Sequence, residues 1–213
     1  MTSNRFFDAC VLLGGSSDRE AHCLADWAAA LGHRFNRGET PTVITTGCCH
    51  HSLDIFPGRT EAQLARDLLI EFGVPSSNIL CEEESGDLLG RLVHTRDRIL
   101  EPCSWYHVEL LLPGADDEDL CHIQRVLGPE YVLTLTSEDL STNERSEEDL
   151  EAFRETISHV VDSGDGQDLN SLIRSPKAKA APRVPDAKRF ILLKRLTHSA
   201  RVHAILATHG GIP

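Results

Sequence analysis

The chain reads Thr-Val-Ile-Thr-Thr-Gly over residues 42–47 and Thr-Glu-Ala-Gln-Leu-Ala-Arg-Asp-Leu-Leu-Ile-Glu-Phe over residues 60–72. The first run is rich in β-branched residues and ends at a glycine, which is typical of a buried strand. In the second run apolar residues recur at helical spacing, Thr60 can cap the helix and Gly73 closes it. The two stretches predict a strand followed by a helix, the unit from which parallel sheets are built.

The same alternation continues along most of the chain. Strands are predicted at residues 8–13, 42–46, 78–81, 106–112 and 131–135. Helices are predicted at residues 17–31, 60–72, 87–100, 117–127 and 146–161. Because crossover connections between parallel strands are short and right-handed, this order predicts an α/β fold. We expect it to be doubly wound and Rossmann-like, with a mostly parallel five-stranded sheet.

The charge of the chain changes sign near residue 173. Residues 1–173 hold 12 Lys and Arg against 32 Asp and Glu, a net charge of −20, whereas residues 174–213 carry a net charge of +8. We predict a domain over residues 1–162, a linker over residues 163–186 and a basic helical tail over residues 187–213. The basic tail could bind RNA, an acidic protein partner or the acidic body itself, and its helix could serve as a lid or an oligomer arm.

Composition excludes several classes of protein. The longest apolar runs fall short of the ~18–20 residues that a membrane span needs. We expect reduced thiols and a cytoplasmic location, because we recognise no secretory leader and the seven cysteines are an odd number. An acidic body repels phosphates, so nucleic acid is not the expected partner.

Polar residues gather where the predicted strands end, at the edge of the sheet that binds ligands in open α/β folds. Gly14 and Gly15 end the first strand, and Arg19 follows within the next helix, an arrangement suited either to an anion or to a tight turn. The candidate ligand-binding residues are Gly14, Gly15, Arg19, Gly47, Cys48, Glu82 and Ser85.

Glu61 opens the strongest predicted helix and is the candidate catalytic residue, as a base. The alternative is that its carboxylate only favours the positive end of the helix. Cys48 precedes Cys49, His50 and His51, but adjacent residues rarely all face one ion, so no metal site is predicted. Cys48 is then either a reactive thiol at a helix start or a small buried side chain.

Several short motifs occur in an order that resembles the SanA/YdcF/ElyC-type family of α/β proteins. They are a strand ending in Leu-Gly-Gly at residues 13–15, a Thr-Glu-Ala helix start at residues 60–62, Gly-Val-Pro at residues 73–75 and Glu-x-x-Ser at residues 82–85. The similarity covers roughly residues 8–100. It implies a Rossmann-like sheet and a small-molecule site built from Gly14, Gly15, Arg19, Gly47, Glu61, Glu82 and Ser85.

The resemblance also implies S-adenosylmethionine as a ligand or cofactor, since one family member is reported to bind it. The chain departs from the family pattern after Ser85, where Leu88, Gly90 and Arg91 stand at positions that are usually polar. It departs again after the fourth strand, where Pro113-Gly114-Ala115-Asp116 lacks the family's His and Arg. These departures indicate either a changed ligand or a loss of activity.

Three functions follow from these observations. The first is a small-molecule-binding protein or an enzyme acting on a nucleoside-like or phosphorylated ligand such as S-adenosylmethionine, by transfer or hydrolysis rather than redox chemistry, since no dinucleotide fingerprint is present. The second is a specialised-pathway enzyme with a divergent substrate. The third is a non-catalytic interaction protein whose basic tail binds an acidic partner or mediates homo-oligomer formation.

Overall fold

The structure, a computed structural model, describes residues 7–13, 20–48, 59–136 and 150–157. The elements in chain order are β1 (Ala9–Leu12), α1 (Glu20–Asn36), β2 (Val43–Thr46), α2 (Glu61–Glu71), the 3₁₀ turn η1 (Ser76–Asn78), β3 (Ile79–Glu82), α3 (Leu88–Thr95), the π-helical turn η2 (Arg96–Leu100), α4 (Glu101–Cys103), β4 (His107–Leu111), α5 (Asp117–Leu127) and β5 (Val132–Thr136). A further helical segment is described over residues 150–157.

The five strands form one parallel sheet in the order β3-β2-β1-β4-β5. Leu12 of the central strand β1 pairs in register with Thr45 of β2 on one side and with Leu111 of β4 on the other. The chain therefore builds outward through β2 and β3, crosses over, and continues through β4 and β5. This arrangement confirms the predicted parallel α/β fold.

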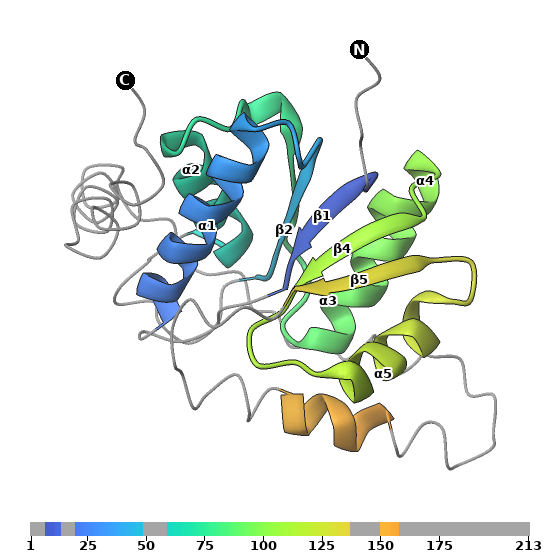
Figure 1. Cartoon of the computed structure of the whole chain (residues 1–213). Coiled ribbons are helices and arrows are strands. Elements are labelled where there is room, and N and C mark those ends of the chain that lie inside the picture. Colours follow the sequence, from blue (N-terminus) through green and yellow to red (C-terminus); the bar gives the residue numbers. More distant parts are fainter. Residues whose placement is uncertain (1–6, 14–19, 49–58, 137–149, 158–213) are drawn as a thin grey trace.

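Helices cover both faces of the sheet. Figure 1 shows α1 and α2 on one face, and α3 and α5 on the other. The first face has a core of side chains from β1, β2, α1 and α2, including Trp27, Leu31 and Leu68. The second core joins α3, α5 and residues 150–157 to the sheet, through Leu92, Ile123 and Phe153 among others. The two-sided burial explains why the strands read as nearly continuous apolar runs.

The helix α2 ends where its sequence predicts. The Thr60 hydroxyl accepts a hydrogen bond of 3.0 Å from the Gln63 amide, which satisfies one of the unpaired N–H groups of the first turn. At the other end Gly73 has φ +90°, a conformation that favours glycine, and its amide donates to Ile70. Local hydrogen bonds therefore mark both ends of this helix.

Two predicted helices differ from the observed ones at their ends. The helix predicted over 17–31 continues to Asn36. The helix predicted over 87–100 is α-helical only from Leu88 to Thr95 and then widens into the π-turn η2. Here Arg96 donates a hydrogen bond of 2.6 Å to the carbonyl of Val126, which lies in the last turn of α5. A contact between two elements therefore accompanies the change from α-helix to π-turn.

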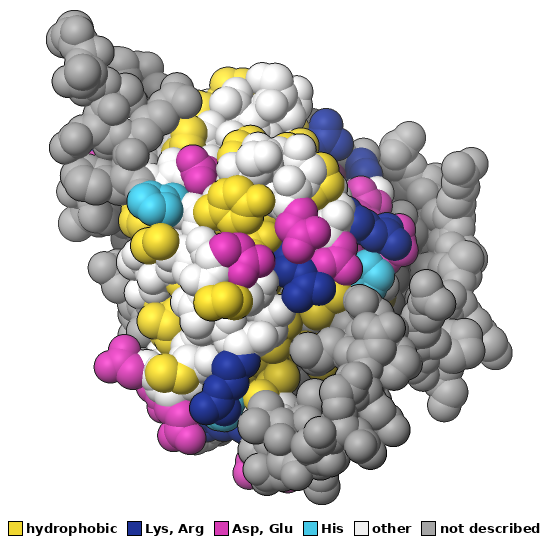
Figure 2. All heavy atoms as spheres, turned by 90° about the vertical axis from the view of Figure 1, so that its right-hand side faces the viewer, with side chains coloured by type: hydrophobic (Ala, Val, Ile, Leu, Met, Phe, Trp, Pro, Cys, Tyr) yellow, Lys and Arg dark blue, Asp and Glu magenta, His cyan; other side chains and the backbone are white. Residues whose placement is uncertain are grey.

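The fifth strand lies at one edge of the sheet, and the surface around it carries both hydrophobic and charged side chains. Figure 2 shows this side of the molecule, with hydrophobic side chains interspersed among acidic and basic ones. The larger exposed apolar side chains among the described residues are Ile70, Tyr106 and Val132. Val132 belongs to β5, and Tyr106 immediately precedes β4.

Several predictions fall outside the described residues. These are the turn Gly14-Gly15, Arg19, the linker over 163–186 and the basic helical tail over 187–213. Within the described ranges, no helix combines the length and apolar character that a membrane crossing requires.

Candidate functional site

Three segments predicted to form the ligand site meet at the carboxyl ends of β2 and β3. The Gly47 amide donates a hydrogen bond of 2.9 Å to the Glu82 carbonyl, and the Cys48 amide donates one of 2.8 Å to the Ser85 carbonyl. The start of α2 joins them, because the Ala62 amide donates a bond of 3.1 Å to the Gly47 carbonyl. The predicted site residues Gly47, Cys48, Glu82 and Ser85 are thus neighbours, as parallel strand ends must be.

Glu82 orders the loop that follows β3. Its Oε1 accepts hydrogen bonds of 2.8 Å from the Glu84 amide and 3.0 Å from the Ser85 amide. The Ser85 hydroxyl donates to Oε2, and both side chains are buried. The Glu82 carboxylate therefore supplies the acceptors that the amides of this tight turn need, and both of its oxygens accept hydrogen bonds. The Glu-x-x-Ser pattern accounts for this loop geometry.

Glu61 contacts an arginine that the sequence analysis had counted only as a departure from the family pattern. The distance from Arg91 Nη2 to Glu61 Oε2 is 2.5 Å, and the two side chains are only 6% and 14% exposed. Asp87 caps α3 by accepting a bond from the Gly90 amide, which places Arg91 in the first turn of that helix. The capping aspartate was a usable sequence signal, since it marks the start of α3 shortly after β3 ends.

Gly47 leaves room for this ion pair. Its φ is +116°, and a Cβ atom at this position would lie 2.4 Å from Glu61 Oε2 and 3.0 Å from Arg91 Nη2. A contact of 2.4 Å is too short, so any other residue at position 47 would force the Glu61 and Arg91 side chains to shift. The glycine predicted to end the strand also shapes the site.

Arg91 retains hydrogen-bonding capacity inside this site. The residue is 5% exposed, and its Nε has no hydrogen-bond partner among the described residues. In a guanidinium group the Nε–H and one N–H of Nη2 lie along the same edge and together match the two oxygens of a carboxylate or phosphate. Glu61 accepts a hydrogen bond from Nη2, and Nε has no partner among the described residues.

The rim of the site carries a second, exposed arginine. Arg98 donates to the Glu84 carboxylate, and both side chains are about half exposed. The hydrogen bond from Arg98 lowers the pKa of Glu84 from its ordinary value. An exposed pair of this kind contributes little to stability, which makes Arg98 a useful comparison for Arg91.

The remaining predictions about this edge have different outcomes. Cys48 is buried and is not part of a disulfide, and the neighbouring residues 49–51 lie outside the described ranges. Among the described residues, no group of three His, Cys, Asp or Glu side chains has a geometry that could hold a metal ion. Gly14, Gly15 and Arg19 also lie outside these ranges, so their place in the site stays a prediction.

A second charge pair joins Arg34 of α1 to Glu109 of β4. The distance from Arg34 Nη2 to Glu109 Oε2 is 2.6 Å, and Thr136 donates a bond of 2.8 Å to Glu109 Oε1. Glu109 pairs in register with Cys10. Burial, and then the Glu109 charge, raise the pKa of the Cys10 thiol well above its ordinary value. Hydrogen bonds therefore satisfy this carboxylate on both oxygens, and we assign the pair a structural role.

No protein-family model matches the chain, and no curated protein matches it. The parallel five-stranded sheet is consistent with a Rossmann-like fold. The narrower resemblance to the SanA/YdcF/ElyC-type family stays a prediction.

Proposed function

We propose that the protein binds a small nucleoside-like or phosphorylated ligand at the carboxyl ends of β2 and β3. The observation that supports this most strongly is the partly unpaired Arg91. Removing a guanidinium group from water is costly unless its N–H groups find partners. Arg91 is 5% exposed and still has an unpartnered Nε, so a ligand oxygen would satisfy a donor that the described residues leave without a partner.

Arginine suits an anionic ligand group for geometric reasons. Its planar fork can donate two parallel hydrogen bonds to a phosphate or carboxylate, and such charge-assisted bonds are about twice as strong as neutral ones. Phosphorylated metabolites, nucleotide sugars and S-adenosylmethionine all carry a group of this kind. The first turns of α2 and α3 lie beside the pair, so their N-terminal dipoles also favour a negative ligand charge.

Glu61 supplies the complementary group, an acceptor for a ligand hydroxyl or amine. If the protein is an enzyme, transfer or hydrolysis remains the reaction class that we propose, with Glu61 as the nearest proton acceptor to the bound ligand. The Glu61 carboxylate already accepts a hydrogen bond from Arg91 when no ligand is bound. The structure therefore supports ligand binding more strongly than a catalytic role for Glu61.

The proposal is tested by a thermal-shift screen of the full chain against nucleotides, nucleotide sugars, S-adenosylmethionine and S-adenosylhomocysteine. A ligand at 100 times its dissociation constant stabilises by about 2.7 kcal/mol, which raises the melting temperature by several degrees. We expect at least one ligand to shift the parent protein and the Arg98→Gln control alike, and to shift Arg91→Gln much less. Equal shifts in all three proteins, or no shift with any ligand, would refute the proposal.

A further inference from the structure

We propose that two copies of this chain associate through β5, whose outer edge pairs antiparallel with the same strand of the second copy about a two-fold axis at Thr134. β5 is the last strand of the sheet, so among the described residues it has a neighbouring strand only on the β4 side (Figure 1). This edge lies opposite the β2–β3 side of the sheet that carries the candidate ligand site, and the inference is independent of the proposed function.

The first argument is that β5 is an exposed edge strand without the features that usually prevent pairing. Val132 is 55% exposed, and Thr134 is exposed as well. The other edge strand, β3, has only buried and half-buried side chains, and α2 packs against it. Natural edge strands are commonly protected by a charged side chain, a proline or a bulge, whereas residues 131–136 contain no charged residue and no proline. The β5 edge is therefore suited to pair with another strand.

The second argument concerns the backbone groups of β5 that face outward. The Val132 amide donates a hydrogen bond of 2.8 Å to the Tyr106 carbonyl, on the β4 side. The N–H and C=O of one residue point to the same side of a strand, and that side alternates from each residue to the next. Leu133 and Leu135 therefore direct their N–H and C=O groups away from β4, toward the outer edge, where a second strand would pair with them.

The third argument is that the strand matches its own reversed sequence. With the two-fold axis at Thr134, Leu133 of one copy lies opposite Leu135 of the other, in a hydrogen-bonded pair that uses the outward backbone groups of both residues. Val132 then lies opposite Thr136, and Thr134 lies opposite its own copy, in the closer pairs that lack backbone hydrogen bonds. Leucine meets leucine, β-branched side chains meet each other, and no charge meets a like charge.

The charge of the rest of the chain determines how this association should respond to salt. Residues 1–173 hold 12 Lys and Arg against 32 Asp and Glu, a net charge of −20, so two copies repel each other at long range. Salt screens this repulsion and leaves the uncharged strand pair intact. We therefore expect the dimer to become stronger as sodium chloride is added. A dimer in which the basic tail of one copy binds the acidic body of the other would become weaker instead.

Sedimentation velocity of the full chain over about 1–100 µM measures the association, a range that covers weak and transient interfaces. We expect an equilibrium between monomer and dimer. Thr134→Lys places two positive charges opposite each other at the axis, and Thr134→Glu places two negative charges there. Each change should weaken the dimer at least about tenfold, because like charges directly opposite each other oppose pairing. An equimolar mixture of the two variant proteins should dimerise again, since opposite charges then face each other.

Ile70→Lys is the matched control. Ile70 is 40% exposed on α2, so this change adds the same charge at an exposed position away from β5, and it should leave the dissociation constant of the dimer unchanged. Circular dichroism and melting curves establish that each variant is folded. Because residue 134 is exposed, both substitutions are compatible with the fold, and either one alone tests whether the dimer depends on this strand.

Three results would overturn the inference. The parent protein could remain monomeric over the whole concentration range at both low and high salt. The two Thr134 variants could dimerise as strongly as the parent, and if salt also dissociates that dimer, the basic tail is the contact. Finally, the mixture of the two variants could fail to restore the dimer, which would exclude a two-fold axis at this residue.

Discussion

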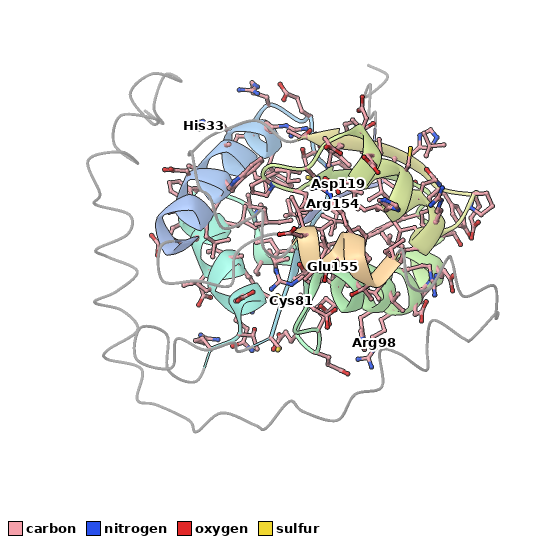
Figure 3. The ribbon with its side chains drawn as sticks, turned by 90° about the horizontal axis from the view of Figure 1, so that it is seen from below. His33, Cys81, Arg98, Asp119, Arg154 and Glu155 are labelled. Carbon is pink, nitrogen blue, oxygen red and sulfur yellow. The ribbon has the colours of Figure 1, made fainter. Side chains whose placement is uncertain are left out.

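Arg154 donates two hydrogen bonds of 2.7 Å each to the fully buried carboxylate of Asp119, and Figure 3 shows the two side chains together. The contact joins the helical segment 150–157 to α5. Arg154→Ala should therefore lower the free energy of unfolding by about 1–3 kcal/mol, because a buried carboxylate loses its charged partner while Arg154 itself is partly solvated. Urea unfolding of the full chain measures this change.

The neighbouring Glu155 provides the control for that measurement. It is exposed on the same helix, so Glu155→Gln should change the free energy of unfolding by less than about 0.5 kcal/mol. If Arg154→Ala and Glu155→Gln changed the free energy of unfolding by equally small amounts, the Arg154 contact would contribute nothing to the docking of this segment.

Gly47→Ala should destabilise the protein more than Gly38→Ala, although both glycines have positive φ. Nothing lies within 4 Å of a Cβ at Gly38, so alanine there costs only the backbone strain, about 1 kcal/mol. At Gly47 the new methyl group also meets Glu61 and Arg91, which raises the expected loss to about 2–3 kcal/mol. Thermal unfolding of the two variants provides the comparison, and equal losses would show that the ion pair moves aside without cost.

Cys10 should resist alkylation in the folded protein. It is fully buried, and burial together with the Glu109 charge raises the pKa of its thiol, whereas the reacting species is the thiolate. Cys103 and Cys121 are exposed and should react first with iodoacetamide at pH 8. Peptide mass spectrometry over time measures the rates, and labelling in urea should make them similar. Fast labelling of Cys10 without denaturant would contradict its placement in the central strand.

Tyr131 should make the stability of the protein depend on pH in the alkaline range. Burial, and then the charges of Glu101 and Glu130, raise its pKa to about 12. Since the unfolded value is near 10, the neutral phenol contributes stability that is complete below pH 10 and is lost as the pH rises toward 12. The chain has two tyrosines, so absorbance titration of Tyr106→Phe follows Tyr131 alone.

The matching control removes the titrating group. The Tyr131 hydroxyl is buried without a partner among the described residues, so Tyr131→Phe should fold normally and lose the stability change between pH 10 and pH 12. A Tyr131 phenol that ionises near pH 10 in the folded protein would show that the ring is accessible to water.

The order of strands and helices is predictable from this sequence because each element depends mainly on nearby residues. The strand at residues 42–46 and the helix at residues 60–72 carry their own β-branched run, cap and closing glycine, and both form within a residue or two of the predicted ends. The π-turn η2 is not predictable in the same way. It is accompanied by a hydrogen bond between Arg96 and Val126, two residues on different elements. The spacing of apolar residues along the sequence does not predict such a contact.

The candidate site shows the same division between local and distant information. Gly47, Glu82 and Ser85 follow strands directly, so their meeting at one edge could be expected from the topology alone. The partner of Glu61 could not, because Arg91 lies 30 residues further along and reaches it only where α2 and α3, which pack on opposite faces of the sheet, both begin beside the ends of β2 and β3. Pairing across a fold depends on the packing of helices, which a single sequence does not specify.

The central position of β1 has a consequence for the synthesis of the protein. Ala9 pairs with Val108, so one edge of β1 must wait for a strand made roughly 100 residues later, which corresponds to about 5–20 s of translation. During that interval β1 can pair with β2, but its other edge lacks the strand that completes it. The nascent chain therefore exposes an apolar, hydrogen-bonding edge until β4 leaves the ribosome, and this is the stage at which assistance from a chaperone would matter most.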